Sequence, residues 1–494
     1  MYKRSELRFP VLVLALFAAF AVLYMYNIGG YLTDDDEGTD LYQAWQLQKG
    51  RRPGIDFMSE QQPLYMLLGS ALIGWFGRTV LPLRLLSAVH VLGGALGLGI
   101  VVRRWWDDTT AAITVGVTLS SGLVYQQARV YRADAMMLSW EMLGLAVLLV
   151  TIRKPRNGLW ALAGALYGIA ALMKPFGVLP VVGVGLYALS WLWRERTQWR
   201  KVVVGVLCFG LAFLLVWLGA SAVMYGRYGF YYREAFEQQY SLGRQEEPLR
   251  RLLNLPTGCV EFVIQNLVFL FIVPLWLLNK PKGWLHQSEM RLLVAQVMSP
   301  LVFLAMTRPF YARYLLYLVP VLALMLGRQI SLAFAKIGQD WPAARHYATL
   351  GVLVFTGFAA ATTLPSMPPL LLGRESDTLA LAAYVAEHTQ SDDKVLGDYP
   401  GINFLANRDS IYEAAIVNAA QIKGQIVTSD LLIDRIESGH VEMVLLHVAG
   451  GHPLPHHLID LADFDRFRQY LNDRFHLLTV FDRAGQQIEI YRHG

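Results

Sequence analysis

The sequence is poor in charged residues and almost free of cysteine. Charged side chains make up 16% of its 494 residues, whereas a soluble globular protein carries about 25%. Hydrophobic residues make up 55% and the mean hydropathy is +0.37, which excludes disordered, collagen-like and coiled-coil chains. Cys208 and Cys259 are too few for a disulfide framework and have no metal-ligand spacing. The remaining class is a polytopic membrane protein.

The charges that are present divide the chain into two parts. Residues 1–369 hold 33 Lys and Arg against 20 Asp and Glu, a net charge of +13, and residues 370–494 hold 10 against 18, a net charge of −8. The pI near 9.0 therefore indicates basic loops beside a membrane rather than a nucleic-acid partner. We expect a transmembrane domain at 1–369, with a long outer loop at 29–79, and a soluble domain at 370–494.

Apolar runs long enough to cross a bilayer, about 20 residues, predict about eleven transmembrane helices. The first run follows Lys3 and Arg4 but no small-residue cleavage site follows it, so we expect an uncleaved span. The segments 158–173 and 176–193 are short and are alternatively one broken helix. The run 63–77 is too short to span and is expected at the outer interface. The eleven runs are 9–28, 80–102, 109–126, 134–152, 158–173, 176–193, 202–225, 258–278, 290–306, 311–327 and 346–364.

Basic residues in alternate loops predict the orientation. With the N-terminus in the cytoplasm, every inside loop is basic, as the positive-inside rule requires, and an odd number of spans places the tail outside. These loops hold Arg103-Arg104, Arg153-Lys154-Arg156, Arg194-Arg196-Arg200-Lys201, Lys280-Lys282 and Arg328-Lys336-Arg345. The expected fold is a multi-pass α-helical protein of the cytoplasmic membrane, with outer interfacial helices and a small extracytoplasmic α/β domain.

The acidic tail has the pattern of a small mixed α/β domain. It contains no G-x-G-x-x-G motif, P-loop or nucleophile elbow. His452, His456 and His457 are either metal ligands or part of a solvated loop, and the tail is expected to cap the outer face or to help bind an acceptor. The predicted elements are helices at Asp377–Glu387 and Ser429–Ile436, the second opened by a Ser/Asp cap, and strands at 395–396 and 441–448.

Three groups of polar residues stand at outer span ends. The first is the acidic run Asp34–Asp40, which continues into apolar residues at helical spacing and so predicts an amphipathic interfacial helix with carboxylates at its start. The second is Arg132 with Asp134, which is either functional or an orienting ion pair. The third holds Arg308 and Arg313 among tyrosines, which suits a phosphate headgroup or an aromatic–basic belt. Together these groups favour a reaction between a phosphate-linked lipid and a hydroxyl or amine.

The order of these motifs resembles the C-type glycosyltransferases, and within them the protein O-mannosyltransferase and aminoarabinose transferase branch. The resemblance covers about residues 10–330. It rests on Asp36-Glu37-Gly38, then Tyr42, Ala44, Leu47, Gly50, Pro53, Asp56-Phe57 and Glu60-Gln-Gln-Pro63-Leu-Tyr65, followed by Arg132-Ala-Asp134, Met173-Lys174-Pro175 and Arg313-Tyr314-Leu-Leu. The resemblance implies transfer of a sugar from a polyprenyl phosphate, undecaprenyl phosphate in a bacterium, to an acceptor at the outer face with inversion.

The resemblance also implies roles for individual residues. Asp36 matches the catalytic base, with Asp35 open because of the triple Asp; Glu37 is its adjacent partner, and Asp134 orients the acceptor or the base. The residues expected to bind the donor phosphate are Arg313, Arg308, Arg132 and Lys174. The residues expected to contact the acceptor or substrate are Asp35, Tyr42, Asp56, Glu60 and Tyr65.

The sequence leaves the acceptor and the alternatives open. A lipid or glycan acceptor is favoured over a protein, because no additional module for a protein substrate is evident. No cofactor is expected, and a divalent metal is not expected to be required. A transporter or lipid-carrier flippase is the alternative function, although the charges at outer span ends argue against it. An inactive scaffold is a third possibility. The sequence departs from its relatives at Gln61-Gln62-Pro63, where they often carry Lys or His and a double proline.

Overall fold

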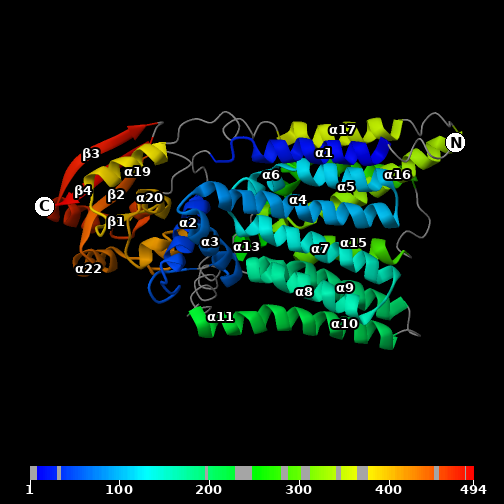
Figure 1. Ribbon diagram of the computed structural model, residues 1–494, viewed down its shortest axis with the longest axis horizontal. Coiled ribbons are helices and arrows are strands. Elements are labelled where there is room, and N and C mark those ends of the chain that lie inside the picture. The colour runs from blue at the N-terminus through cyan, green and yellow to red at the C-terminus, as the bar shows by residue number, and fades with distance from the viewer. Residues whose placement is uncertain are drawn as a thin grey trace.

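The computed structural model describes residues 8–29, 35–59, 61–194, 199–228, 248–279, 287–301, 312–340, 347–363, 377–449, 456–483 and 486–494. Long helices lie side by side in a bundle, and a β-sheet with its own helices covers one end of it (Figure 1). Two helices of the first loop, α2 (Asp35–Gln48) and α3 (Pro63–Phe76), lie between the bundle and the sheet.

The bundle contains apolar helices of unequal length. The helices of residues 8–228 are α1 (Arg8–Met25), α4 (Val80–Trp105), α5 (Asp108–Ser120), α6 (Gly122–Ala128), α7 (Ala133–Arg153), α8 (Asn157–Met173), the 3-10 turn η1 (Pro175–Val178), α9 (Leu179–Arg194), α10 (Trp199–Leu214), the π-turn η3 (Leu215–Gly219) and α11 (Ala220–Tyr228). Those of residues 248–363 are α13 (Pro248–Gln265), the 3-10 turn η4 (Leu267–Phe271), α14 (Ile272–Asn279), α15 (Ser288–Met298), the 3-10 turn η7 (Ala312–Leu315), α16 (Leu318–Asp340) and α17 (Tyr347–Thr363).

Five helical segments of the described residues are long and apolar enough to cross a membrane: Val80–Trp105, Ala133–Arg153, Pro175–Arg194, Trp199–Met224 and Leu318–Ile337. A sixth span is possible if Pro256–Gln265 and Leu267–Asn279, which bend by 94°, count as one. Shorter apolar helices occupy Val13–Met25, Pro63–Phe76, Asn157–Met173 and Thr349–Thr362. The chain is thus a multi-pass membrane protein, and the count of eleven spans stays a prediction.

Two of the expected spans are broken, and the breaks contact each other. Ser121 is extended between α5 and α6, and Asn266 interrupts the bent segment between α13 and η4. The Ser121 hydroxyl donates to Asn266 Oδ1 at 2.6 Å, and Asn266 Nδ2 donates to the Phe262 carbonyl at 2.9 Å. A helix break inside a bilayer requires polar partners of this kind, because no water is present to replace the lost backbone hydrogen bonds.

The C-terminal part forms a four-stranded sheet in the order β1-β2-β4-β3. β1 and β2 are parallel, whereas β4 is antiparallel to both β2 and β3. Its elements are α19 (Asp377–His388), β1 (Lys394–Gly397), α20 (Pro400–Ala406), η10 (Glu413–Ala415), α21 (Ala419–Lys423), α22 (Ser429–Gly439), β2 (Val441–Ala449), η11 (Leu458–Asp460), α23 (Phe464–Arg474), β3 (Phe475–Arg483) and β4 (Gln486–His493). Helices and strands therefore occur where the tail was expected to have them. The cap of α22 differs, because Thr428 is the N-cap and its hydroxyl accepts from Leu431 N at 3.3 Å.

The sheet has two apolar faces because successive strand residues point to opposite sides. Met443 and Leu445 join a core that also contains Leu41, Trp45 and Tyr65 of the first loop. The intervening residues of β2, by contrast, join a separate core under α22 and α23. One face of the sheet thus buries the first loop, and the tail and residues 35–76 share a hydrophobic core.

Candidate active site

Asp36 lies at the start of α2 and receives hydrogen bonds from two arginines. Arg132 Nη2 and Arg313 Nη1 both donate to its Oδ2, the second at 2.9 Å. The Asp36 side chain remains 50% exposed, and none of the residues that the structure describes donates to its Oδ1. One oxygen of this carboxylate is therefore held, while half of the side chain stays accessible.

A second ion pair lies beside the first. Lys174 Nζ donates to Asp134 Oδ2 at 2.5 Å, and Asp134 lies in the first turn of α7. Lys174 is extended (φ −152°, ψ 138°) because a residue that precedes a proline avoids the helical conformation; Pro175 thereby ends α8 next to Asp134. Arg132 is the residue before α7, so the two pairs share one end of that helix.

These five side chains form the anion cluster: Asp36, Arg132, Asp134, Lys174 and Arg313. Three cations and two carboxylates leave one surplus positive charge, which favours binding of an additional anion. Arg132 is 5% exposed, whereas Arg313 is 29% exposed. An anion that reaches Asp36 from the open side therefore meets Arg313 first.

Glu37 is placed quite differently from Asp36. It is fully buried, and Arg84 of α4 donates to both of its oxygens, Nε to Oε1 at 2.7 Å and Nη2 to Oε2 at 2.6 Å. The backbone N–H of Tyr131 adds a third hydrogen bond to Oε1 at 2.8 Å. This bidentate pair ties α2 to α4 and leaves the carboxylate without access to a substrate. In this structure Glu37 makes positioning contacts, and its expected part in a reacting pair stays a prediction.

Tyrosines complete the support under α2. Tyr65 and Tyr131 stack with ring centroids 4.6 Å apart. The Tyr65 hydroxyl donates to Asp40 Oδ2 at 2.9 Å and to the Tyr131 carbonyl at 3.0 Å. The Tyr42 hydroxyl accepts from Ser410 N at 2.9 Å. Tyr42 and Tyr65 are both fully buried and hold α2 in this structure, and the expectation that they contact the acceptor stays a prediction.

The tail contacts α2 directly. Asp409 accepts from Gln46, Lys49 and Arg51, the lysine at 2.7 Å, and Gln43 Nε2 donates to the Ala415 carbonyl at 3.3 Å. Most of α2 is therefore buried between bundle and tail. The predicted amphipathic helix exists, but its polar side faces protein rather than solvent.

Gly38 shows how closely the tail approaches the acidic segment. A Cβ at this position would collide with the ring of Tyr399, the residue before α20. Gly401 approaches the same ring and the Gly38 Cα from the other side. A side chain at position 38 would therefore require the Tyr399 ring to move.

Comparisons with known proteins address the fold and the family. The model of the dolichyl-phosphate-mannose-protein mannosyltransferase family matches residues 61–219. The undecaprenyl phosphate-alpha-4-amino-4-deoxy-L-arabinose arabinosyl transferase of Pseudomonas paraeruginosa is 25% identical over 347 residues, 65% of this chain. The match spans 59% of that relative's length.

Two solved structures superpose over nearly the whole chain. ArnT from Cupriavidus metallidurans, bound to undecaprenyl phosphate, has a TM-score of 0.68 at 16% identity and covers 97% of both chains. The archaeal oligosaccharyltransferase AglB from Archaeoglobus fulgidus, in complex with an inhibitory peptide and a dolichol-phosphate, has a TM-score of 0.60 at 12% identity and covers 98% of this chain and 74% of that one. The chain has the C-type glycosyltransferase fold. The resemblance identified from the sequence is confirmed.

Within this C-type glycosyltransferase fold, several expected site residues lie apart from the anion cluster. Asp56 accepts from the backbone N–H of Arg52 at 2.8 Å in an exposed turn and also pairs with the Arg52 side chain. Arg308, Glu60 and the side chain of Asp35 lie outside the described residues, as does His452. In the part of the chain that the structure describes, no three His, Cys, Asp or Glu side chains come together to hold a metal ion.

The sequence reasoning missed two residues that support the candidate site. Arg84 stood out only as a charge inside an apolar run, and its partner Glu37 was assigned to chemistry. Nothing in the sequence around Tyr131 indicated that it would contact Glu37. Asp409, by contrast, lies more than 350 residues from its partners, so no local pattern could reveal the contact.

Proposed function

We propose that this chain transfers a sugar from a polyprenyl-phosphate carrier to a lipid, glycan or protein acceptor at the outer face of the cytoplasmic membrane. The observation that carries the proposal is the anion cluster, in which a half-exposed carboxylate lies within hydrogen-bond reach of two arginines. A base for the acceptor and cations for a phosphate are the two requirements of such a transfer. The relatives are named as enzymes that use undecaprenyl phosphate and dolichyl phosphate sugars, which supports the donor class.

The proposed reaction is a single displacement with inversion. The acceptor oxygen attacks the anomeric carbon and passes its proton to Asp36. The bond between that carbon and the carrier oxygen breaks, and its electron pair leaves on the phosphate. The products are the glycosylated acceptor and the carrier phosphate monoester. The leaving phosphate needs charge stabilisation rather than a strong acid, and Arg313, Arg132 and Lys174 are the groups proposed to supply it.

The contacts of Asp36 suggest how donor and base are coupled. Both arginines donate to Oδ2, so an incoming phosphate competes with Asp36 for the same donors. We propose that the phosphate takes over part of these hydrogen bonds and leaves the carboxylate as a stronger proton acceptor. Asp134 holds Lys174 in place and thereby supports the phosphate side. In this scheme Asp36 becomes an effective base only when the donor is bound.

The cations proposed for the phosphate are side chains, so we propose that no metal ion is required. Extensive treatment with a chelator is expected to leave transfer unchanged. Restoration of a lost activity by one particular divalent cation would overturn this part of the proposal.

The experiment uses the purified full-length chain in nanodiscs with a panel of radiolabelled polyprenyl-phosphate sugars and a native membrane extract as acceptor. Release of carrier phosphate and transfer of label are both followed. Release with one sugar that disappears in Asp36→Asn is expected, and the labelled product identifies the acceptor. Carrier binding without release for any sugar, together with carrier movement across vesicles, would favour a flippase instead.

A further inference from the structure

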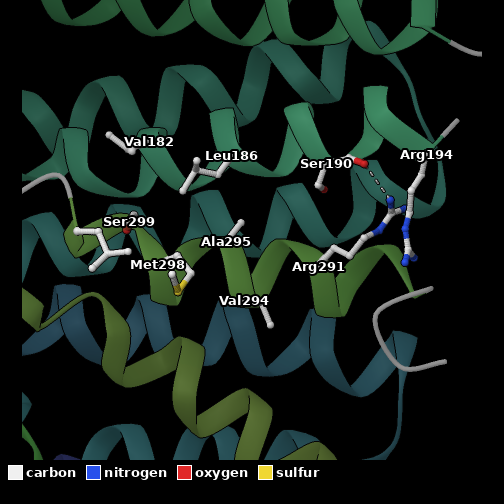
Figure 2. Close-up of a pocket in the computed structure, with 10 residues that line it drawn as sticks. Val182, Leu186, Ser190, Arg194, Arg291, Val294, Ala295, Met298 and Ser299 are labelled. Carbon is white, nitrogen blue, oxygen red and sulfur yellow. Dashed lines mark hydrogen bonds between the residues drawn. The ribbon is translucent and has the colours of Figure 1, made fainter. Parts of the chain in front are cut away.

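A groove between α9 and α15 lies far along the bundle from the anion cluster. Its volume is 620 Å³. Figure 2 shows its apolar body and, at one end, Ser190, Arg194 and Arg291. The apolar residues that line it are Val182, Leu186, Val294, Ala295, Met298 and Leu301.

The two arginines make one end of this groove cationic. Arg291 is 7% exposed, and its Nη2 donates to the Ser288 hydroxyl at 3.0 Å while Nη1 lies 3.5 Å from the Ser190 carbonyl. Arg194 is the last residue of α9 and is exposed. Figure 2 shows both side chains at this end of the groove. Two guanidinium groups at the end of an apolar groove are complementary to a phosphate that carries a hydrocarbon chain.

Aromatic residues place this end at the depth of the lipid headgroups. Trp193 is 81% exposed and Trp199 is 50% exposed, and exposed tryptophans collect at the membrane–water interface. At the same end Arg153 donates to Glu289, two residues before Arg291, at 2.5 Å and to the Trp105 carbonyl at 2.7 Å. The arginines of the groove thus stand where a membrane phosphate would be.

The length of the groove matches one lipid leaflet. Val182 and Arg194 are twelve residues apart on α9, which corresponds to about 18 Å along a helix. Half of a hydrocarbon core is about 15 Å thick. An acyl chain that starts at the arginines would therefore follow the apolar residues to the middle of the bilayer.

We propose that this groove binds one anionic phospholipid of the surrounding leaflet, with its phosphate on Arg194 and Arg291 and one acyl chain along the apolar body. The site is separate from the anion cluster, because Lys174 precedes the first turn of the η1–α9 segment and Arg194 is its last residue. The bound lipid would hold α9 against α15, and the η1–α9 segment begins directly after Lys174. The inference does not depend on the reaction proposed for Asp36.

The test measures lipid binding by native mass spectrometry on the full-length chain in detergent. Palmitoyl-oleoyl phosphatidylglycerol is titrated against phosphatidylcholine with the same chains, and undecaprenyl phosphate serves as a competitor. The wild type is expected to retain phosphatidylglycerol in preference to phosphatidylcholine. The Arg194→Gln/Arg291→Gln double variant is expected to bind phosphatidylglycerol about tenfold more weakly, since charged hydrogen bonds to the phosphate are lost.

Two further variants keep the test decisive. Arg104→Gln removes an exposed arginine near the same end that does not line the groove, and it should bind as the wild type does. Leu186→Trp fills the groove from a side chain that is 39% exposed, and it should lose the lipid even if the double variant does not fold. Equal loss in Arg104→Gln, equal retention of both phospholipids, retention in Leu186→Trp, or displacement by undecaprenyl phosphate alone would overturn the proposal.

Discussion

Asp36 and Glu37 are neighbours in the sequence, yet the protein holds them in opposite ways. Asp36 is half exposed and has one oxygen held by two arginines, whereas Glu37 is fully buried and has both oxygens held by Arg84. The first arrangement has a surplus positive charge, because one carboxylate meets two arginines, and it is half exposed, whereas the second is neutral and closed. In the proposed reaction the two adjacent acids have different tasks, because Asp36 would take the proton while Glu37 fixes the helix that carries it.

The largest expected effect is a loss of activity in a variant of Asp36. Asp36→Asn keeps the size and the hydrogen-bonding oxygen but cannot accept the proton, so kcat should fall by about 10²–10⁴-fold. The unfolding midpoint should change little, since Asp36 is half exposed. Transfer of label from the donor and thermal unfolding in detergent measure the two quantities.

The control for this experiment is Asp108→Asn, which removes a carboxylate that is 39% exposed and pairs with Arg103. It should leave both transfer and stability near wild type. A folded, fully active Asp36→Asn enzyme would contradict the assignment and transfer the role of base to Asp35.

The second effect concerns stability. Arg84→Met retains the length of the side chain but leaves Glu37 as an unpaired buried carboxylate, which costs about 3–5 kcal/mol. We expect a large fall of the unfolding midpoint and a loss of folded protein. The double variant Arg84→Met/Glu37→Gln should recover much of the stability, because the buried charge is then removed as well. Unfolding followed by intrinsic fluorescence measures both variants.

The activity per folded molecule distinguishes a positioning role of Glu37 from a direct role in proton transfer. If Glu37 only positions α2, the double variant should show a reduced kcat with an unchanged pH profile. A shift of the pH profile in that variant would mean that Glu37 itself exchanges the proton, and the contrast with Asp36 would fail.

A third and smaller effect tests the cation that lies nearest the open side. Arg313→Gln removes one charged hydrogen bond to a bound phosphate, so KM for the donor should rise about tenfold, or about 1.4 kcal/mol, with a smaller change of kcat. Arg328→Gln is a suitable control, because it removes a similarly exposed arginine that pairs with Asp107 on another part of the chain. An unchanged KM for the donor would indicate that Arg313 is part of an aromatic–basic belt and does not bind the phosphate.

The anion cluster itself was largely predictable, whereas its supports were not. Asp36, Arg132, Asp134 and Arg313 were expected at outer span ends, where charged residues beside an apolar run give a strong local signal, and Lys174 was implied by the resemblance. Their separation into two ion pairs depends on how four helix ends meet, which no local pattern contains.

The limits of prediction are clearest around α2. The spacing of Leu41, Ala44 and Leu47 predicted an amphipathic helix, and a helix is present. The same periodicity could not reveal that its polar face is also covered, because the cover comes from the tail. Tyr42 looked available for a substrate, yet Ser410 occupies its hydroxyl. Burial by a distant segment is the information that a single sequence lacks.

The smallest expected effect concerns Asp409, whose ion pairs are more accessible than the buried pair of Arg84 and Glu37. Asp409 is 19% exposed and joins the tail to Lys49 and Arg51. Burial opposes its ionisation, but hydrogen bonds from Lys49 and Gln46 hold the pKa of Asp409 below its ordinary value. Because the folded-state pKa is lowered, the stabilisation is present above the ordinary carboxyl pKa and is lost as the pH falls through the folded value. Asp409→Asn should therefore cost about 1 kcal/mol at neutral pH.

This prediction sharpens the contrast between the two kinds of ion pair. The stability difference between wild type and Asp409→Asn should shrink when the pH is lowered below 4, and it should shrink in high salt, because partly exposed pairs are screened. The difference for Arg84→Met should persist in high salt, since Arg84 is buried. Thermal unfolding at several salt concentrations measures both. Equal salt sensitivity would show that Glu37 and Arg84 are reached by solvent, and the division of work between Asp36 and Glu37 would then lose its physical basis.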